Sequence, residues 1–114
     1  MPAIISSISI FAVPASATET RCGWLSNPTP RNWYLIDKDS PWIISWQGGY
    51  EAKGMDNLPI NEKEYVKRNG YYGYGCACMD VVTDSARLRI SEIRGGESLP
   101  LSTCRPDPNV PKSP

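Results

Sequence analysis

The residues best suited to chemistry in this sequence are four cysteines, Cys22, Cys76, Cys78 and Cys104. Cys76 and Cys78 are two positions apart, so on a β-strand their side chains point in the same direction. A bond between these two would close a strained small ring, and each therefore needs a distant partner. Two pairings remain: 22–76 with 78–104, or 22–78 with 76–104. The sequence does not decide between them, but either one ties both chain ends to one strand.

The Cys76/Cys78 pair has an alternative use in thiol–disulfide exchange. Such chemistry needs an exposed thiol whose pKa is lowered by a helix N-terminus or a nearby cation. Neither is evident around this pair, and Cys22 and Cys104 would then lose their structural partners. A four-thiolate zinc site is disfavoured as well, because zinc ligands usually come in pairs separated by at least two residues. The sequence favours two structural disulfides and predicts no metal site.

The chain has few residues suited to catalysis, because it contains no histidine. Histidine is the most common general base and the activator of serine and cysteine nucleophiles. An enzyme would have to use paired carboxylates for acid–base work. The candidate pairs are Asp37 with Asp39, Glu62 with Glu64, and Asp80 with Asp84. Each pair is better explained as a turn or a solvated surface, so we predict no catalytic residue and no cofactor.

Large aromatic side chains are the remaining functional signal, with 4 Trp and 6 Tyr in 114 residues. We expect most of them in the core, Trp42 and Trp46 included, but a small sheet cannot cover every ring. Trp and Tyr are also the usual anchors of protein and glycan contacts. A binding face is therefore predicted, and its candidates are Trp24, Trp42, Trp46, Tyr50 and Tyr71.

The charge balance excludes partners that are recognised mainly by electrostatics. Twelve Lys and Arg residues balance twelve Asp and Glu residues, so the formal net charge is zero. No overall field attracts nucleic acid or an acidic membrane surface. We therefore expect neither as a partner.

The first residues predict export. The stretch from Met1 to Val13 is apolar, carries no charge and is too short to span a membrane. Pro14 and the small residues of Ala15-Ser16-Ala17 then fit a signal-peptidase site. We predict a signal peptide over residues 1–17, cleaved after Ala17, and a periplasmic or secreted protein that is not an integral membrane protein. An even number of cysteines fits that oxidising location. Residues 18–108 are expected to form one β domain and residues 109–114 a flexible tail.

The pattern of the domain is one of short strands. Residues 33–36 and 42–47 are predicted to form a hairpin, while the two X-Pro steps in 21–30 predict an ordered loop. Asn61 with Glu64 could cap a short helix, but Tyr65-Val66 before Asn69-Gly70 favours a strand entering a type I′ turn.

The strand after that turn is expected to be central. It places Tyr72, Tyr74, Cys76 and Cys78 on one face and only small residues on the other, where another backbone can approach. A turn at 83–86 leads into residues 87–90, where polar and apolar residues alternate. This stretch and the strand before the turn are expected to form the longest hairpin, which Gly95-Gly96 ends. The fold class is all-β: a small disulfide-stapled sandwich or partly open barrel of about five or six strands.

Four strings together resemble a known family. They are Arg21-Cys-Gly-Trp-Leu-Ser-Asn-Pro-Thr-Pro30, Gln47-Gly-Gly-Tyr-Glu51, Gly73-Tyr-Gly-Cys-Ala-Cys78 and Cys104-Arg-Pro-Asp-Pro108. The chain resembles an uncharacterised family of small exported bacterial proteins, a domain of unknown function. The resemblance spans the chain after the signal peptide and implies export and a four-cysteine scaffold, but no catalytic activity.

The function expected from these observations is that of an exported binding module. Its partner would be an envelope protein or a glycan, and an inhibitor or an immunity-type protein are forms that such a module takes. The alternative is a thiol–disulfide redox protein that uses Cys76 and Cys78.

Overall fold

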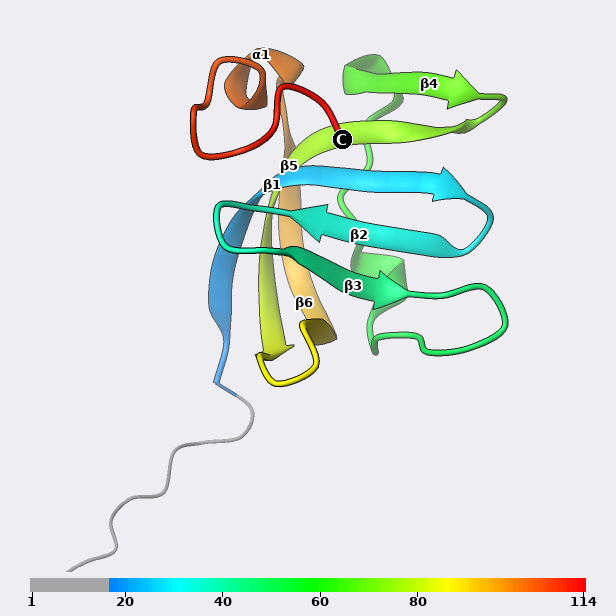
Figure 1. Ribbon diagram of the computed structural model, residues 1–114, viewed down its shortest axis with the longest axis vertical. Helices are drawn as coiled ribbons and strands as arrows, with labels where there is room; N and C mark the ends of the chain where they lie inside the picture. Colours follow the sequence, from blue (N-terminus) through cyan, green and yellow to red (C-terminus); the bar gives the residue numbers. More distant parts are fainter. Residues whose placement is uncertain (1–16) are drawn as a thin grey trace, which may run out of the picture.

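The computed structural model describes residues 17–114, so the predicted signal peptide lies, apart from Ala17, outside the described residues. The chain forms strands and three short helical turns (Figure 1). In chain order these are β1 Glu19–Thr29, β2 Asn32–Ile36, β3 Pro41–Ser45, η1 Met55–Asn57, η2 Glu62–Glu64, β4 Tyr65–Asn69, β5 Tyr72–Asp84, β6 Arg89–Leu99 and α1 Leu101–Cys104.

The strands form a partly open barrel. The sheet order is β1-β2-β3-β6-β5-β4, and β5 also pairs with β1, which closes a ring. Most neighbours are antiparallel, but β3 and β6 are parallel and share only the Ile43–Arg89 pair. The residues after β3 fill the gap beside β6, where Lys53 N donates to Ser91 O at 3.1 Å. The predicted all-β class is therefore confirmed, in its barrel form.

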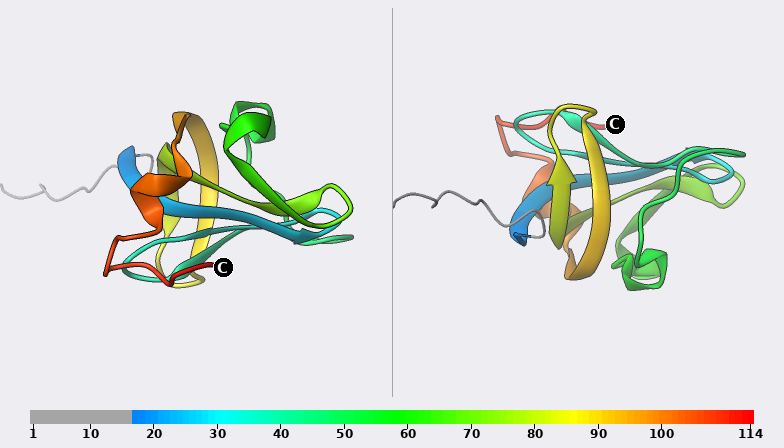
Figure 2. Two further views of the ribbon diagram at one scale, coloured as in Figure 1. Left: turned by 90° about the horizontal axis from the view of Figure 1, so that it is seen from above. Right: turned by 90° about the horizontal axis from the view of Figure 1, so that it is seen from below.

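Strand β5 is the central strand, as predicted. Its first half pairs with β4 and its second half with β6, while β1 runs along most of its length. The space beside its glycines is filled by backbone, because a Cβ on Gly73 would collide with the carbonyl of Val66. Figure 2 shows the β5–β6 hairpin crossing the direction of the strands β1 to β3.

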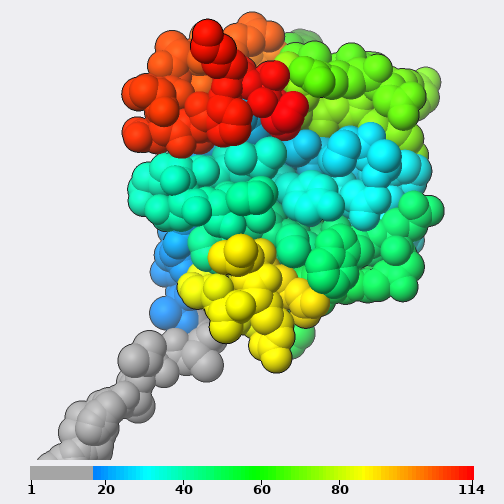
Figure 3. Space-filling view, viewed as in Figure 1, coloured from blue at the N-terminus to red at the C-terminus, as the bar shows by residue number. Residues whose placement is uncertain are grey.

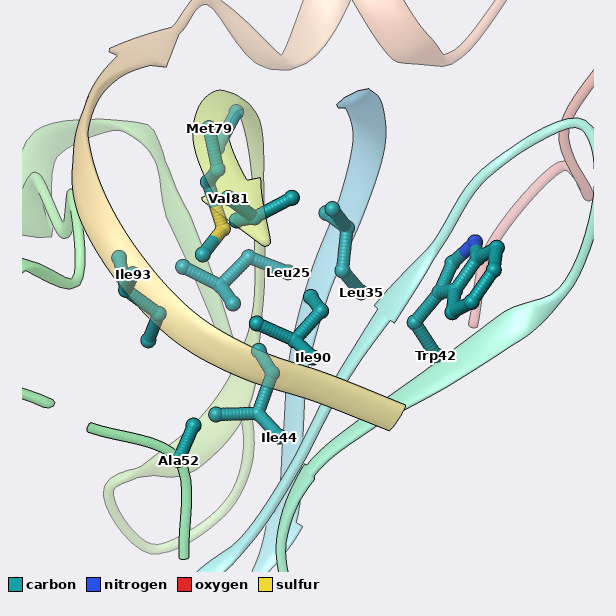
Figure 4. Packing of buried hydrophobic residues seen from close by; sticks show 10 residues of the cluster. Leu25, Leu35, Trp42, Ile44, Ala52, Met79, Val81, Ile90 and Ile93 are labelled. Carbon is teal, nitrogen blue, oxygen red and sulfur yellow. The ribbon is translucent and has the colours of Figure 1, made fainter. Parts of the chain in front are cut away.

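The inside of the barrel is packed with aliphatic side chains. Alternate residues of the strands point inward, and in Figure 4 these side chains point toward one another between the ribbons. The fully buried members are Leu25, Leu35, Ile44, Met79, Val81, Ile90 and Ile93. The interior is therefore a hydrophobic core.

A second cluster lies on the outer face of β1 and β5. It contains Trp24, Tyr74 and Cys76, and the C-terminal residues Cys104 and Val110 cover it. The residues of opposite parity on the same strands, such as Leu25 and Ala77, face the barrel interior. The chain thus buries both faces of these strands, which explains why β5 has no solvated side in its middle.

The disulfides are Cys22–Cys78 and Cys76–Cys104, the second of the two pairings that the sequence left open. Cys22 and Cys78 are direct partners across the β1–β5 ladder, with their Cα atoms 4.0 Å apart. Cys76 faces the outer cluster and meets Cys104 at the end of α1. Both bonds start from β5, as the spacing of Cys76 and Cys78 implied.

The prediction of a loop over residues 21–30 was wrong, because all of these residues except Pro30 belong to β1. The X-Pro steps do favour extended backbone, and extended backbone here joins a ladder. Pairing with β5 extends to Asn27, opposite Gly73, so Pro28 and Pro30 lie beyond the last β5 pair. The prolines therefore do not interrupt the β1–β5 hydrogen bonds.

Two turn predictions also need correction. Gly95-Gly96 does not end β6, because the register shift there is a bulge and the strand continues to Leu99. In the β4–β5 hairpin only Gly70 has a positive φ, 63°, so the turn is not the type I′ turn expected on Asn69-Gly70. The competing readings of Asn61 and Tyr65 both hold: Asn61 accepts from Lys63 N to cap η2, and β4 follows directly.

The C-terminal segment makes defined contacts in the region expected to be a flexible tail. Val110 is buried, and the indole N–H of Trp24 donates to the carbonyl of Pro111 at 2.7 Å. These contacts hold the segment as far as Pro111 on the outer cluster. Flexibility beyond that point stays a prediction.

Candidate functional site

The most prominent exposed aromatic group lies where β3 ends and β6 begins. Trp46 follows β3 directly and is 38% exposed. A tight turn returns the chain to Tyr50, because Trp46 N donates to Tyr50 O at 2.8 Å and Gly49 N to Trp46 O at 3.2 Å. Gly48 supplies the left-handed conformation that this turn needs, with φ of 75°. The turn therefore holds two aromatic rings beside each other, with centroids 6.3 Å apart.

Arg89, the first residue of β6, completes this group. Its guanidinium carbon lies 4.4 Å from the ring centre of Tyr50 and 4.9 Å from that of Trp46. Cation–π contacts of this kind hold an arginine side chain in place without a carboxylate partner. The Tyr50 hydroxyl donates to Ile90 O at 2.6 Å, which fixes its ring on β6. Burial raises the pKa of Tyr50, so its hydroxyl remains a donor at neutral pH.

Leu88 adds an apolar side chain next to Arg89. It is 47% exposed, and its φ of 54° lies in the left-handed region that a branched side chain rarely adopts. A hydrogen bond from Ile43 N to Leu88 O at 2.9 Å holds this conformation. In the space-filling view the turn between β5 and β6, drawn yellow, lies against the green segment after β3 (Figure 3). We call Trp46, Tyr50, Leu88 and Arg89 the aromatic–arginine surface.

Two ion pairs involve residues that neighbour this surface in the sequence. Arg31 and Glu51 form an exposed ion pair at 3.4 Å, and Glu51 is next to Tyr50. Asp84 and Arg87 form another at 3.0 Å in the turn before Leu88. Bonding to Arg87 lowers the pKa of Asp84, so its carboxylate stays charged at neutral pH. Aromatic and arginine side chains near mixed charges are the composition of a protein-binding surface.

Trp46 and Tyr50 were predicted from the sequence as binding residues, but Leu88 and Arg89 were not. Residues 87–90 were predicted to lie on one alternating strand, which would bury Leu88 together with Ile90. The turn instead extends through Leu88 and the strand begins at Arg89, so Ile90 is buried and Leu88 is exposed. Only the partners across the barrel reveal the role of Arg89, and the sequence carries no local signal for them.

The other predicted binding residues are not part of this surface. Trp24 and Trp42 are buried, and so do not lie where a partner can reach them. The indole N–H of Trp42 donates to Asp37 at 3.0 Å, and the ring lies beneath the Arg21 guanidinium at 4.2 Å. Tyr71 is 81% exposed but stands on the separate β4–β5 turn. The five predicted aromatics therefore divide between core, surface and a remote turn.

The carboxylate pairs considered for catalysis have structural partners. Asp37 binds Arg21 at 2.7 Å, and its other oxygen accepts from the backbone N–H groups of Asp39 and Ser40. Glu64 accepts from Leu101 N at 2.7 Å. Asp80 accepts from the hydroxyl of Thr20 at 2.8 Å. Together with the pair of Asp84 and Arg87, these contacts hold at least one carboxylate of each predicted pair within the fold.

Other site classes find no support in the described part of the chain. Within residues 17–114 every cysteine is in a disulfide, and no cluster of His, Cys, Asp or Glu side chains could hold a metal ion. No helix there is long and apolar enough to cross a membrane.

Comparison with known proteins identifies a family. Residues 16–111 match the family described as "Protein of unknown function (DUF4087)". The chain belongs to this family. No curated protein and no solved structure matches the chain. The match covers all six strands and both disulfides, and it assigns no activity to any of their residues.

Proposed function

We propose that this member of the family is an exported binding module that contacts another protein through the aromatic–arginine surface. The observation that carries the proposal is an exposed tryptophan held against a tyrosine and an arginine. Trp, Tyr and Arg are the three residue types that dominate the energy of protein interfaces. Their side chains are already fixed by the turn of residues 46–50 and by β6, so little conformational entropy is lost on binding.

A protein partner fits this surface better than a glycan does. Sugar rings stack on a free flat aromatic face, whereas Arg89 lies over the rings of both Trp46 and Tyr50. Gly49 packs against Trp46 as well, since a Cβ on Gly49 would be 3.7 Å from the indole. We infer that the indole meets a partner by its edge, together with the exposed Leu88. An edge and an apolar side chain fill a pocket in another protein.

The scaffold supports an inhibitor or immunity-type role. Two disulfides on β5 fit an oxidising extracellular location and hold the barrel in one conformation. Rigid presentation of a few anchors is the property that gives small protein inhibitors high affinity. The neutral net charge implies that affinity comes from these anchors rather than from long-range attraction.

The redox alternative has weaker geometric support. Cys76 is buried beneath α1 and the C-terminal segment, so a thiol reagent or partner thiolate cannot reach it in this conformation. Cys22 is exposed, but it is bonded to Cys78, whereas Cys76 is bonded to Cys104. Cys76 and Cys78 therefore do not form the bond with each other that the redox alternative uses. Alkylation of the exported protein under denaturing conditions separates the two proposals. Four blocked cysteines in cells favour the structural role, and a reduced fraction of either bond favours exchange.

The binding proposal is tested by affinity capture from an envelope extract, followed by titration of the purified captured protein. The matched variants are Trp46→Ala, Arg89→Ala and Tyr71→Ala, which each remove an exposed or half-buried large side chain. We expect saturable binding that falls at least about tenfold with the first two changes, as at interface hot spots, and does not change with the third. Binding that depends on Tyr71 instead, or on none of the three, would overturn the proposed surface. Recovery of glycan with no protein would overturn the choice of partner.

A further inference from the structure

A groove on the outside of the barrel is not part of the proposed interface. It is a cavity of about 360 Å³ formed between the outer face of the strands and Pro114 of the C-terminal segment. Its volume is within the usual range of small-molecule sites. The lining comes mainly from apolar side chains: Pro28, Tyr34, Ile36, Pro41 and Tyr74.

The strand geometry explains why this surface is apolar. Residues 24, 26, 34, 36 and 74 share the outer face of neighbouring strands, since Ser26 pairs with both Tyr34 and Tyr74. Trp24 at one end is covered, because its indole N–H binds Pro111 and Val110 packs against it. The same face continues past the covered part to Tyr34 and Ile36, which are half-buried. Figure 3 shows the C-terminal residues, drawn red, lying against the β1–β2 and β4 regions on this side.

One cation is placed on this apolar wall. Arg68 of β4 lines the groove, with its guanidinium carbon 5.1 Å from the ring centre of Tyr74. Its hydrogen bond goes to the neutral hydroxyl of Ser113 at 3.4 Å. No side chain lining the groove carries a carboxylate, and Arg68 forms no salt bridge within residues 17–114, although Pro114, the last residue, also lines the groove. A guanidinium beside an apolar wall and without an anionic side-chain neighbour complements a ligand with an apolar body and an anionic head.

We propose that the groove binds a small amphipathic carboxylate, such as a free medium-chain fatty acid. The acyl chain lies along Pro28, Tyr34 and Ile36, and the carboxylate pairs with Arg68. Arginine's planar fork matches a carboxylate, and the apolar lining removes methylene groups from water. The site does not depend on the proposed protein interface, since the groove shares no residue with the aromatic–arginine surface.

The test titrates the oxidised protein with hexanoate, octanoate and decanoate below their micelle concentrations, following amide shifts and heats of binding. We expect affinity to rise up to about fourfold for each added methylene that is buried, until the groove is full. Decanol, which has the same chain without the charge, should bind about tenfold more weakly than decanoate. The shifts should centre on Ser26, Gly73 and Tyr74.

The decisive variant is Arg68→Gln, with Arg105→Gln as the control for loss of an exposed arginine elsewhere. Arg68→Gln should abolish the preference for decanoate over decanol while leaving decanol affinity unchanged, and Arg105→Gln should preserve the preference. Equal binding of the two ligands to the unmodified protein would overturn the proposal. So would a parallel loss of both ligands in Arg68→Gln, shifts at a different surface, or no saturable binding of decanoate.

Discussion

Removal of the Cys76–Cys104 disulfide should release the C-terminal segment before the barrel unfolds. The bond closes a loop with a sequence separation of 28, which in the chain-entropy treatment stabilises the fold by about 3.5 kcal/mol. The bond of Cys22 with Cys78 spans a separation of 56, for which the same treatment gives about 4 kcal/mol. The two losses are similar in size, but the positions of the bonds differ. Cys22 and Cys78 already face each other in a strand ladder, whereas Cys104 reaches β5 from outside the barrel.

The double variants C76A/C104A and C22A/C78A separate a loss of folding stability from the release of the C-terminal segment. Denaturant titration should give comparable decreases in the free energy of unfolding for the two. Hydrogen exchange should differ, because C76A/C104A frees α1 and the segment after it. The amides of Arg105, Asp107 and Val110, which bind the carbonyls of Leu101, Cys104 and Asp107, should lose protection in that variant alone. Trp24 fluorescence should shift to longer wavelength as its cover opens.

Two results would refute this reasoning. If C76A/C104A kept full protection at Arg105, Asp107 and Val110, then Val110 and the Trp24–Pro111 hydrogen bond would suffice to hold the segment. If C22A/C78A lost protection there as well, the segment and the barrel would open together. Either outcome would remove the distinction between a core inside the barrel and a second cluster stapled to its outside.

Three further perturbations test the packing around these clusters. Asp37→Asn should destabilise the fold by roughly 3 kcal/mol in denaturant titration, because it leaves Arg21 without its most buried partner, while Asp39→Asn at the exposed side of the same arginine should cost much less. Hydrogen bonds from Arg21 and Lys38 lower the pKa of Asp39. Its contribution to folding stability is therefore present above the ordinary aspartate pKa and is lost as pH falls through the lower folded value. The loss of stability in acid should be shallower in Asp39→Asn, and an unchanged loss would contradict the role given to these hydrogen bonds. Trp24→Phe should lower the free energy of unfolding by about 1–3 kcal/mol, because the buried ring loses its bond to Pro111, whereas Trp46→Phe, at the surface, should leave it nearly unchanged in the same titration.

The sequence predicted the parts of the fold that depend on local chemistry. The period of two through residues 72–78 identified β5 and the common direction of Cys76 and Cys78. The same period predicted Trp42, Ile44 and Trp46 on one face of a strand. Trp42 and Ile44 lie on β3 and are buried, but β3 ends at Ser45, and Trp46, which was expected in the core, is exposed. The β4–β5 hairpin was found from Asn69-Gly70, although the turn moved one residue onward. These features need only neighbouring residues to be specified.

Features that depend on distant partners were missed. Residues 21–27 read as a loop because β1 gains its strand character from pairing with β5, about fifty residues later. The choice of disulfide pairing follows from the direct opposition of Cys22 and Cys78, which is a matter of register. Burial of Trp24 depends on Val110 and Pro111, and exposure of Leu88 depends on where the β5–β6 turn ends. None of these is encoded in a local period.

The candidate site shows the same division. Trp46 and Tyr50 could be named because large aromatics exceeded what a small sheet can cover. Arg89 could not, because it reaches those two rings only when β6 lies parallel to β3. The sequence can therefore predict single binding residues, but the surface that they form together depends on how the barrel places β3 beside β6.

The central claim is that a partner protein meets this molecule at Trp46. The most direct measurement places a photo-crosslinking phenylalanine analogue at position 46 and, in a second variant, at the more exposed position 71, and irradiates each in an envelope extract. We expect one discrete crosslinked protein from position 46 and none from position 71. Crosslinks from position 71 alone, or an identical set from both positions, would contradict it.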